Sequence, residues 1–408
     1  MPHHFFCCRT YQLKFAIVRS SKGSVMKLVI AASLIATSAV MSLAPLPSFA
    51  QQSAQPVPYI YATGLEAPRG LRFGPDGYLY VAEAGTGGTN STGSTCTQVP
   101  GPVGPYTGGM NARISKIDPH GTRTTVASGL PSTQDAQGDL IGVADVAFLN
   151  GTLYAAVAGG GCSHGNPTSP SGIVMVDPSS GKWTLIADIG AFLKTHPTKY
   201  ESADDFEPDG TLYSLIVDDG KLLTVEPNHG EVISVTTSGE IKQVIDISAS
   251  EGHIVPTSIV AREGSLYVGN LNLFPIDPQW ARILTLSNGD RDDDSNRAPG
   301  FETHGFRIVN SKAGFTTVVA VDFGPDGLLY ALELSDGAAY PTPGLGKVVR
   351  VKHSGEIEDV ITGLAVPTGM TFGRDGRLYV SNFGAIPAGT PLGSTAGQIL
   401  RFDIAPGW

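Results

Sequence analysis

The chain is short of charge, of basic residues above all, and of cysteine. Only 16% of its 408 residues are charged, and 27 Lys and Arg stand against 37 Asp and Glu. Proteins that bind nucleic acid or anionic membranes need basic patches, so this deficit argues against both kinds of partner. The nine histidines show no HxH or HExxH spacing, so no zinc site is indicated. A GxSxG nucleophile elbow and a phosphate-binding loop are missing as well.

Long hydrophobic runs are also scarce, and the one that exists lies near the N-terminus. From Met26 the chain reads MKLVIAASLIATSAVMSLAPLPSFA, a basic start followed by an apolar stretch and small residues before Ala50. This pattern is typical of a secretory signal peptide that is cleaved after Ala50, with Met26 as the start of translation. Pro45 and Pro47 interrupt the run, and no second run could span a bilayer.

From the leader we predict the domain boundaries of the chain and its location outside the cytoplasm. The predicted divisions are a leader with a signal peptide over residues 1–50, a linker over 51–57 and a single domain over 58–406. Residues 1–50 hold five of the 27 basic residues and none of the 37 acidic ones, so the rest of the chain has 22 basic and 37 acidic residues and a net charge of −15. We therefore expect a monomeric, exported protein, periplasmic or secreted, without a membrane span or a nucleic-acid partner.

What the chain does have is a repeated phrase. FGPDGYLYVAEAG begins at Phe73, and close copies begin at Phe323 (FGPDGLLYALELS) and Phe372 (FGRDGRLYVSNFG). In two of the copies the turn is Pro-Asp-Gly, in which Pro presets the backbone, Asp bonds back to it and Gly accepts a positive φ. The flanks are rich in β-branched and aromatic residues, so each copy predicts a strand, a tight turn and a second strand.

Six such strand pairs can be aligned, and each is followed by a second strand pair. The first pairs occupy residues 71–83, 146–157, 215–226, 259–270, 321–333 and 370–382. In the third pair the turn is placed at Asp218-Asp219-Gly220, and the similar segment FEPDG at 206–210 is assigned to the preceding link. Six units of four strands predict an all-β, six-bladed β-propeller. Stacked β-sandwiches are the alternative, but they do not explain the repeat.

The two ends of the repeat predict how the ring closes. The last unit has only three strands, and an unmatched strand, PYIYATGL at residues 58–65, precedes the first unit. If this N-terminal strand completes the last blade, the ring has no open edge.

Long loops are expected on one face of the propeller. The loops between second and third strands, residues 86–111, 159–171, 271–280, 334–346 and 383–397, emerge on the same side as the links between blades. The turns on the opposite side are tight, apart from the acidic loop 287–300, which imitates a calcium loop without its required Gly and Glu. Function on a rigid scaffold usually lies in loops, so we expect the long-loop face to carry it.

Polar residues recur at the end of the second strands. The six positions are Glu83, Val157, Glu226, Asn270, Glu333 and Asn382. Five of these side chains carry oxygen and, together with Asp145 at the start of an innermost strand, form a candidate ligand-binding ring at the channel mouth. Carboxylates and amides could bind calcium or a polar ligand. Alternatively, each side chain caps its own strand by bonding to loop amides.

The leader removes two of the four cysteines and leaves Cys96 and Cys162. They lie in equivalent long loops of the first and second blades, which emerge side by side. In an oxidising compartment an even pair is expected to be bridged, so we predict a Cys96–Cys162 disulfide.

The segments PTGMTFGRDGRLYVSN at 367–382 and GFTTVVAVDFGPDGLLYALE at 314–333 resemble NHL-type six-bladed propellers. More narrowly, VPTSIVAREGSLYVGNLNLFPI at 255–276 and ESADDFEPDG at 201–210 are similar to the ScyD/ScyE family, and the resemblance covers most of residues 58–406. That family implies an exported propeller without implying an activity. Gluconolactonase-like propellers place metal ligands at the starts of the innermost strands, where only Asp145 fits here.

These observations lead to two hypotheses of function. The first is an exported binding scaffold that engages a small polar ligand, a glycan or a protein through the long-loop face. The second is a propeller enzyme, of hydrolase, lyase or oxidoreductase type, that uses the carboxylate ring at the channel mouth, with calcium as a conceivable cofactor.

Overall fold

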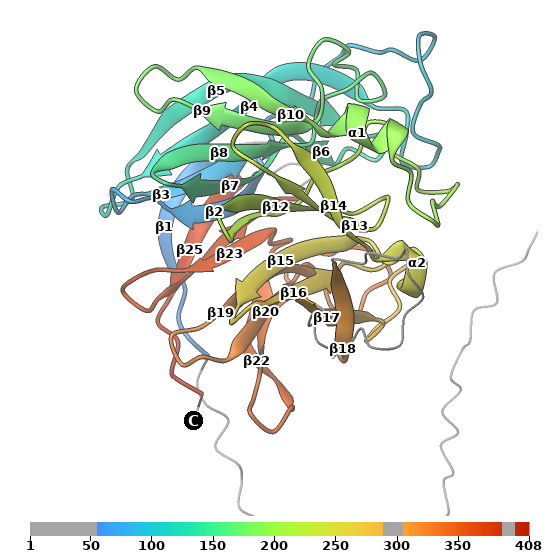
Figure 1. Cartoon of the computed structure of the whole chain (residues 1–408). Helices are drawn as coiled ribbons and strands as arrows, with labels where there is room; N and C mark the ends of the chain where they lie inside the picture. The colour runs from blue at the N-terminus through green and yellow to red at the C-terminus, as the bar shows by residue number, and fades with distance from the viewer. Residues whose placement is uncertain (1–54, 289–304, 386–395, 408) are drawn as a thin grey trace, which may run out of the picture. The chain divides into compact units, whose positions relative to one another are not determined.

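Almost all regular structure is in short antiparallel strands that form six sheets (Figure 1). The computed structural model describes residues 55–288, 305–385 and 396–407. In these residues each sheet is one blade, and the six blades form the β-propeller that the repeat predicts.

The blades follow one another along the chain, and within each blade the strands run from the axis outward. Blade 1 is β2 (Pro68–Phe73), β3 (Leu79–Glu83), β4 (Thr107–Ile117) and β5 (Arg123–Gln134), with the short β6 (Leu140–Ile141) at its edge. Blade 2 is β7 (Val143–Leu149), β8 (Thr152–Val157), β9 (Gly172–Val176) and β10 (Trp183–Asp188). Blade 3 is β11 (Leu215–Asp218), β12 (Lys221–Glu226), β13 (Glu231–Val235) and β14 (Ile241–Asp246).

The second half of the ring has the same pattern. Blade 4 is β15 (Pro256–Arg262), β16 (Ser265–Asn270), β17 (Ala281–Asn288) and β18 (Phe306–Phe315). Blade 5 is β19 (Val318–Phe323), β20 (Leu329–Glu333), β21 (Gly346–Val351) and β22 (Ile357–Leu364). Blade 6 is β23 (Gly369–Phe372), β24 (Leu378–Asn382), β25 (Gly397–Phe402) and the N-terminal β1 (Tyr59–Leu65).

The strand ends agree closely with the repeat alignment. All six second strands end at the aligned residue, and the turn of blade 3 lies between Asp218 and Lys221, as predicted. Two features were not predicted. One is β6; the other is a pair of short helices in the links after blades 2 and 3, α1 (Ile189–Thr195) and α2 (Ser248–Glu251). The Asp188 side chain caps α1 by accepting a hydrogen bond from the Ala191 amide.

The hydrophobic core lies between neighbouring blades, because the strands are apolar on both faces. Tyr80 and Ala82 of blade 1, for example, pack in one cluster with Val146 and Leu153 of blade 2. Each blade therefore depends on its neighbour to bury one of its faces.

The predicted closure of the ring is confirmed. Figure 1 shows β1, in blue, beside β25, in red, and the two strands pair antiparallel from Tyr59 with Arg401 to Leu65 with Gly397. The ring of Tyr61 packs edge-on against Tyr379 of the same blade, with centroids 5.1 Å apart.

Several sequence predictions lie outside the described residues: the leader 1–50, most of the linker 51–57, all but the first two residues of the acidic loop 287–300, and residues 386–395 of the long loop 383–397. No helix in the described part of the chain is long and apolar enough to cross a membrane.

Deleting residues 58–65 tests the closure. The truncated protein loses β1 and exposes the backbone of β25, so we expect aggregation or a large drop in melting temperature. Size-exclusion chromatography and thermal unfolding measure both. A protein that lacks only residues 51–54 is the control, and a 58–65 deletion that stays monomeric with an unchanged melting temperature would contradict the closure.

Candidate functional site

The axial channel contains a small cavity of about 30 Å³, lined by the innermost strands. Its lining residues are Gly70, Leu71, Arg72, Asp145, Tyr213, Ser214, Ser258, Ile259, Val319, Ala320, Val321, Thr368, Gly369 and Met370. A cavity of this size holds about two water molecules, whereas sites for small organic ligands are about ten times larger. The channel is therefore narrow.

Asp145 is the carboxylate of the cavity, and it also joins two blades. It accepts a hydrogen bond from the Leu215 amide of blade 3 at 2.8 Å, besides one from its own neighbour, Val146. Burial raises the pKa of Asp145 to about 6, although Arg72 in the same cavity lowers it in part. A Cβ at position 70 would collide with the Asp145 side chain, so this site requires Gly70.

Asp322 plays the matching role between blades 5 and 6. It accepts hydrogen bonds from the Phe372 amide of blade 6 at 3.3 Å and from the Phe323 amide at 2.8 Å. Burial raises its pKa, and Arg72 again opposes the shift. Arg72 is thus a cation near two buried carboxylates, which the sequence analysis did not single out.

The other predicted ring residues bond to the link that enters their own blade. The carboxylates of Glu83, Glu226 and Glu333 accept from the amides of Glu66, Thr211 and Thr316 at 2.6, 2.7 and 3.2 Å. Asn382 accepts from the Ala365 amide at 2.8 Å, and Asn270 donates to the Ile254 carbonyl at 2.8 Å. These are the bonds of the capping alternative, and each fixes a link between blades.

The predicted ring is not brought together at one point of the described structure. No hydrogen bond or ion pair there joins two of its six members, and Asp145 alone lines the axial cavity. The pKa of Glu333 is raised to about 7, but the first cause is burial rather than a second ring carboxylate. Ligand binding by this set therefore stays a prediction.

Calcium requires six to eight oxygen ligands. In residues 55–288, 305–385 and 396–407, no three His, Cys, Asp or Glu side chains are arranged so that they could hold a metal ion. Calcium binding therefore stays a prediction.

Blade 3 differs from the other blades at the level of this ring. Glu83 is paired across the strands with Arg113, and Glu333 with Lys347, so each carboxylate has a cation beside it. In blade 3, Glu226 is paired with another acid, Glu231. Both side chains are fully buried, and Oε1 of Glu231 has no hydrogen-bond partner among the described residues.

His229, in the turn between these two strands, compensates for the acid pair. Its Nδ1 lies 2.9 Å from Oε2 of Glu226. Burial alone would lower the pKa of His229, but the Glu226 carboxylate raises it to about 9. Burial, with the Glu226 charge as a further cause, raises the pKa of Glu231 to about 8. At neutral pH the cluster therefore contains a carboxylate, an imidazolium and a neutral carboxylic acid.

This cluster predicts a pH dependence of stability. The folded protein keeps a proton on Glu231 up to about pH 8 and on His229 up to about pH 9. In the unfolded chain the two side chains have their ordinary pKa values of 4.5 and 6.5. The folded state binds more protons in this window, so the free energy of unfolding falls as pH rises from about 5 to 9. We expect Glu231→Gln, which mimics the neutral acid, to match the wild type at pH 5 and to melt several degrees higher at pH 9.

Thermal unfolding from pH 5 to 9 measures this difference. Glu263→Gln is the control, because the Glu263 side chain is 83% exposed. If Glu231→Gln shows the pH slope of the wild type, Glu231 is not held neutral.

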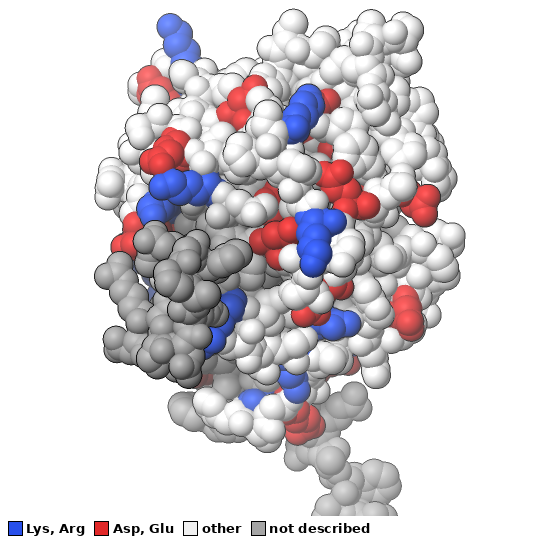
Figure 2. Space-filling model, turned by 45° about the vertical axis from the view of Figure 1, so that its right-hand side comes forward, with Lys and Arg blue, Asp and Glu red and all other residues white. Residues whose placement is uncertain are grey.

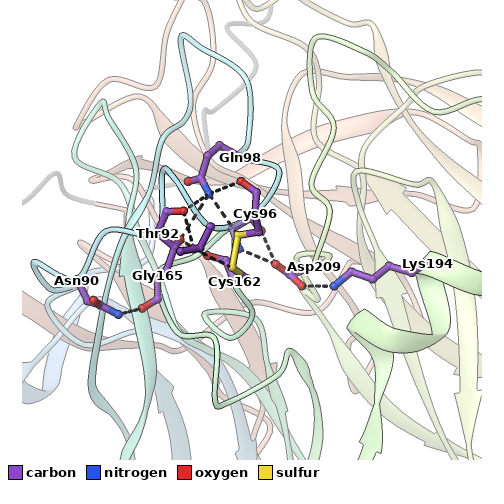
Figure 3. Close-up of a disulfide and its surroundings, with 10 residues drawn as sticks. Asn90, Thr92, Cys96, Gln98, Cys162, Gly165, Lys194 and Asp209 are labelled. Atoms are coloured by element: carbon purple, nitrogen blue, oxygen red, sulfur yellow. Dashed lines mark hydrogen bonds and ion pairs between the residues drawn. A yellow bond between two sulfur atoms is a disulfide. The ribbon is translucent and has the colours of Figure 1, made fainter.

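The long loops of blades 1 and 2 are cross-linked, as predicted, by a disulfide between Cys96 and Cys162 (Figure 3). Its Cα atoms are 6.3 Å apart. Figure 3 shows Asp209, from the link between blades 2 and 3, between the loop of Cys162 and Lys194 of α1. Oδ2 of Asp209 accepts from the amide and hydroxyl of Ser163 at 2.7 and 2.6 Å, and Oδ1 lies 2.6 Å from Nζ of Lys194.

A second buried network joins the same three segments. Oε1 of Glu207 accepts from the hydroxyl of Tyr106 at 2.8 Å, and Oε2 lies 2.7 Å from Nε2 of His164. The other ring nitrogen of His164 lies 2.6 Å from the Gly160 carbonyl. Burial alone would lower the pKa of His164, but the hydrogen bond to Glu207 and the other acceptors and charges around the ring together raise it. Tyr106, His164 and Glu207 are all almost fully buried. The network fixes two loops and the following link to one another.

The sequence pattern alone does not point to this network. Glu207 lies in FEPDG, which the repeat alignment assigns to a link, and His164 is part of no spacing motif. The available signal was an acidic residue in a segment with Phe206 and Pro208, which suggests a buried rather than a solvated link.

Removing the disulfide tests its contribution. The bridge closes a loop of 66 residues, for which the chain-entropy estimate is about 4 kcal/mol. We expect Cys96→Ser/Cys162→Ser to lower the free energy of unfolding by about this amount in urea titrations. Thiol titration of the denatured, unreduced wild type should find no free thiol from this pair, and two reactive thiols per chain would show that the bridge is absent.

Comparison with known proteins gives a fold and no family. No protein-family model matches the sequence, and no curated protein matches it. A putative oxidoreductase (glucose dehydrogenase) from Thermus thermophilus has a TM-score of 0.51 at 15% identity, covering 85% of this chain and 100% of that chain. The calcium-binding protein regucalcin from Agrobacterium tumefaciens has a TM-score of 0.51 at 14% identity, and the match covers 86% of this chain and 94% of that chain. The likeness is one of fold.

Proposed function

We propose that this protein is an exported binding propeller that engages its ligand, a small polar molecule, a glycan or a protein, through the long-loop face. The observation that carries the proposal is the cross-linking of that face. One disulfide and the two networks around Asp209 and Glu207 tie the loops of blades 1 and 2 to the link before blade 3. Ordered loops reduce the entropy that is lost on binding, so a rigid loop face suits recognition.

Four further features support export and the choice of partner. The predicted signal peptide and the resemblance to the ScyD/ScyE family both point outside the cytoplasm, and a disulfide persists in an oxidising compartment. Figure 2 shows one face of the molecule, on which Lys and Arg side chains stand singly among Asp and Glu. Such a surface favours neutral ligands over nucleic acid.

A thermal-shift screen tests the proposal. A ligand that binds only the folded state raises the melting temperature, so we expect a hit among neutral sugars, oligosaccharides, polar metabolites and calcium salts. The shift should shrink in Cys96→Ser/Cys162→Ser, in which the loops are less ordered, and persist in Lys221→Ala, which alters a tight turn on the opposite face. A full panel without any shift, or a hit that only Lys221→Ala abolishes, would count against binding at the long-loop face.

The second candidate is an enzyme whose reacting group is in the axial channel. Asp145 favours it, because a buried carboxyl with a pKa of about 6 can transfer a proton near neutral pH. The enzyme candidate is also favoured by one protein of similar fold, the putative glucose dehydrogenase from Thermus thermophilus. The cavity volume weighs against it, because about 30 Å³ does not admit a sugar. Glucose oxidation with a dye acceptor and gluconolactone hydrolysis, each lost in Asp145→Asn, would favour the enzyme.

A further inference from the structure

Four large apolar side chains on the long-loop face are exposed and lie on two neighbouring loops. Leu273 and Phe274 belong to the loop between β16 and β17, and Tyr340 and Leu345 belong to the loop between β20 and β21. Their exposed fractions are 42%, 49%, 59% and 39%. Exposed aromatic residues that gather in this way usually mark a contact surface.

The two aromatic rings are stacked on each other across the gap between blades 4 and 5. The centroids of Phe274 and Tyr340 are 6.3 Å apart, and the ring planes are inclined by 29°. Just beside them the two loops are joined by a backbone hydrogen bond of 2.8 Å from the Ile276 amide to the Ala339 carbonyl. The rings are therefore held as one unit rather than as two independent side chains.

Hydrogen bonds and an ion pair at the base of both loops hold them in place. The side-chain amide of Asn272, only 3% exposed, donates to the carbonyls of Asp277 and Thr316 at 2.8 and 2.9 Å. In the other loop, Asp336 accepts from the Thr316 hydroxyl at 3.2 Å and from Nζ of Lys347 at 2.8 Å. These contacts reduce the freedom of the loops before any ligand arrives, which lowers the entropic cost of binding.

The size and charge of this surface select the class of ligand. Four exposed apolar side chains are far fewer than the 20 to 30 residues per side, about 800 Å², of a stable protein interface. Asp336 is paired with Lys347, but this lysine also faces Glu333 and Asp359, and Asp277 is exposed. The described acids near the rings therefore outnumber the one lysine, which disfavours anions. A pyranose ring fits instead: it is neutral, its C–H groups pack on the negative face of an aromatic ring, and its hydroxyls can donate to carboxylates.

We propose that Phe274 and Tyr340 form a stacking platform for the pyranose rings of a neutral glycan. The proposal rests on the proposed function, because it assigns a ligand class to the same long-loop face. It predicts better binding of polysaccharides than of single sugars, since a polymer presents many pyranose rings to the same platform and raises their effective concentration there.

Affinity electrophoresis in native gels tests it. The exported, purified protein is run in gels that contain soluble neutral glucan, mannan, galactan or xylan, and we expect at least one polymer to retard it. Phe274→Ala/Tyr340→Ala should weaken that retardation by about tenfold, and Phe274→Trp, which keeps a stacking ring, should retain it. Val309→Ala is the matched control, because Val309 is 50% exposed on β18, away from the two loops.

The outcomes separate the two proposals. Unretarded migration of the wild type in all four polymers overturns the glycan platform, while a non-glycan hit in the thermal-shift screen would still support the proposed function. Retardation that survives in Phe274→Ala/Tyr340→Ala overturns the platform alone. Retardation lost equally in Val309→Ala overturns it too, because the loss would then follow from general damage.

Discussion

The pairing of β1 with β25 is the interaction on which the rest of the structure depends. Each blade buries one face against the blade before it and the other against the blade after it, so an open ring would leave two apolar faces in water. An N-terminal strand that completes the last blade joins the two ends of the domain in one sheet. Closure also fixes the axial channel, because all six innermost strands must then approach one axis.

In the closed ring, each link between blades crosses from an outer strand to the next inner strand. The backbone amides of the link then need hydrogen-bond partners, which is the demand that each blade has to meet. The polar residue at the end of the second strand accepts from a link amide in four blades, and in blade 4 Asn270 instead donates to a link carbonyl. In blades 1 and 5 a cation on the next strand balances the carboxylate. Blade 3 uses an acid pair with His229 instead, and this is where stability is coupled to pH.

The two halves of the long-loop face differ in what they offer. Over blades 1 to 3 the loops are cross-linked by a disulfide and by networks whose polar side chains are almost all satisfied internally. Over blades 4 and 5 the loops instead expose apolar side chains to solvent, among them the stacked pair of Phe274 and Tyr340. A cross-linked set of loops beside an exposed aromatic pair suits the recognition of an uncharged ligand.

Sequence alone determined the blade count, the strand ends, the closure and the disulfide, because a repeat with regular turns encodes each blade locally and equivalent loops of adjacent blades lie side by side. It could not determine where the side chains at the strand ends point. Glu83, Glu226 and Glu333 are aligned in sequence, yet each bonds to its own link. Likewise, Tyr106, His164 and Glu207 come together only because three distant segments meet on one face. Contacts between segments depend on the blade geometry, and that is decided by tertiary packing.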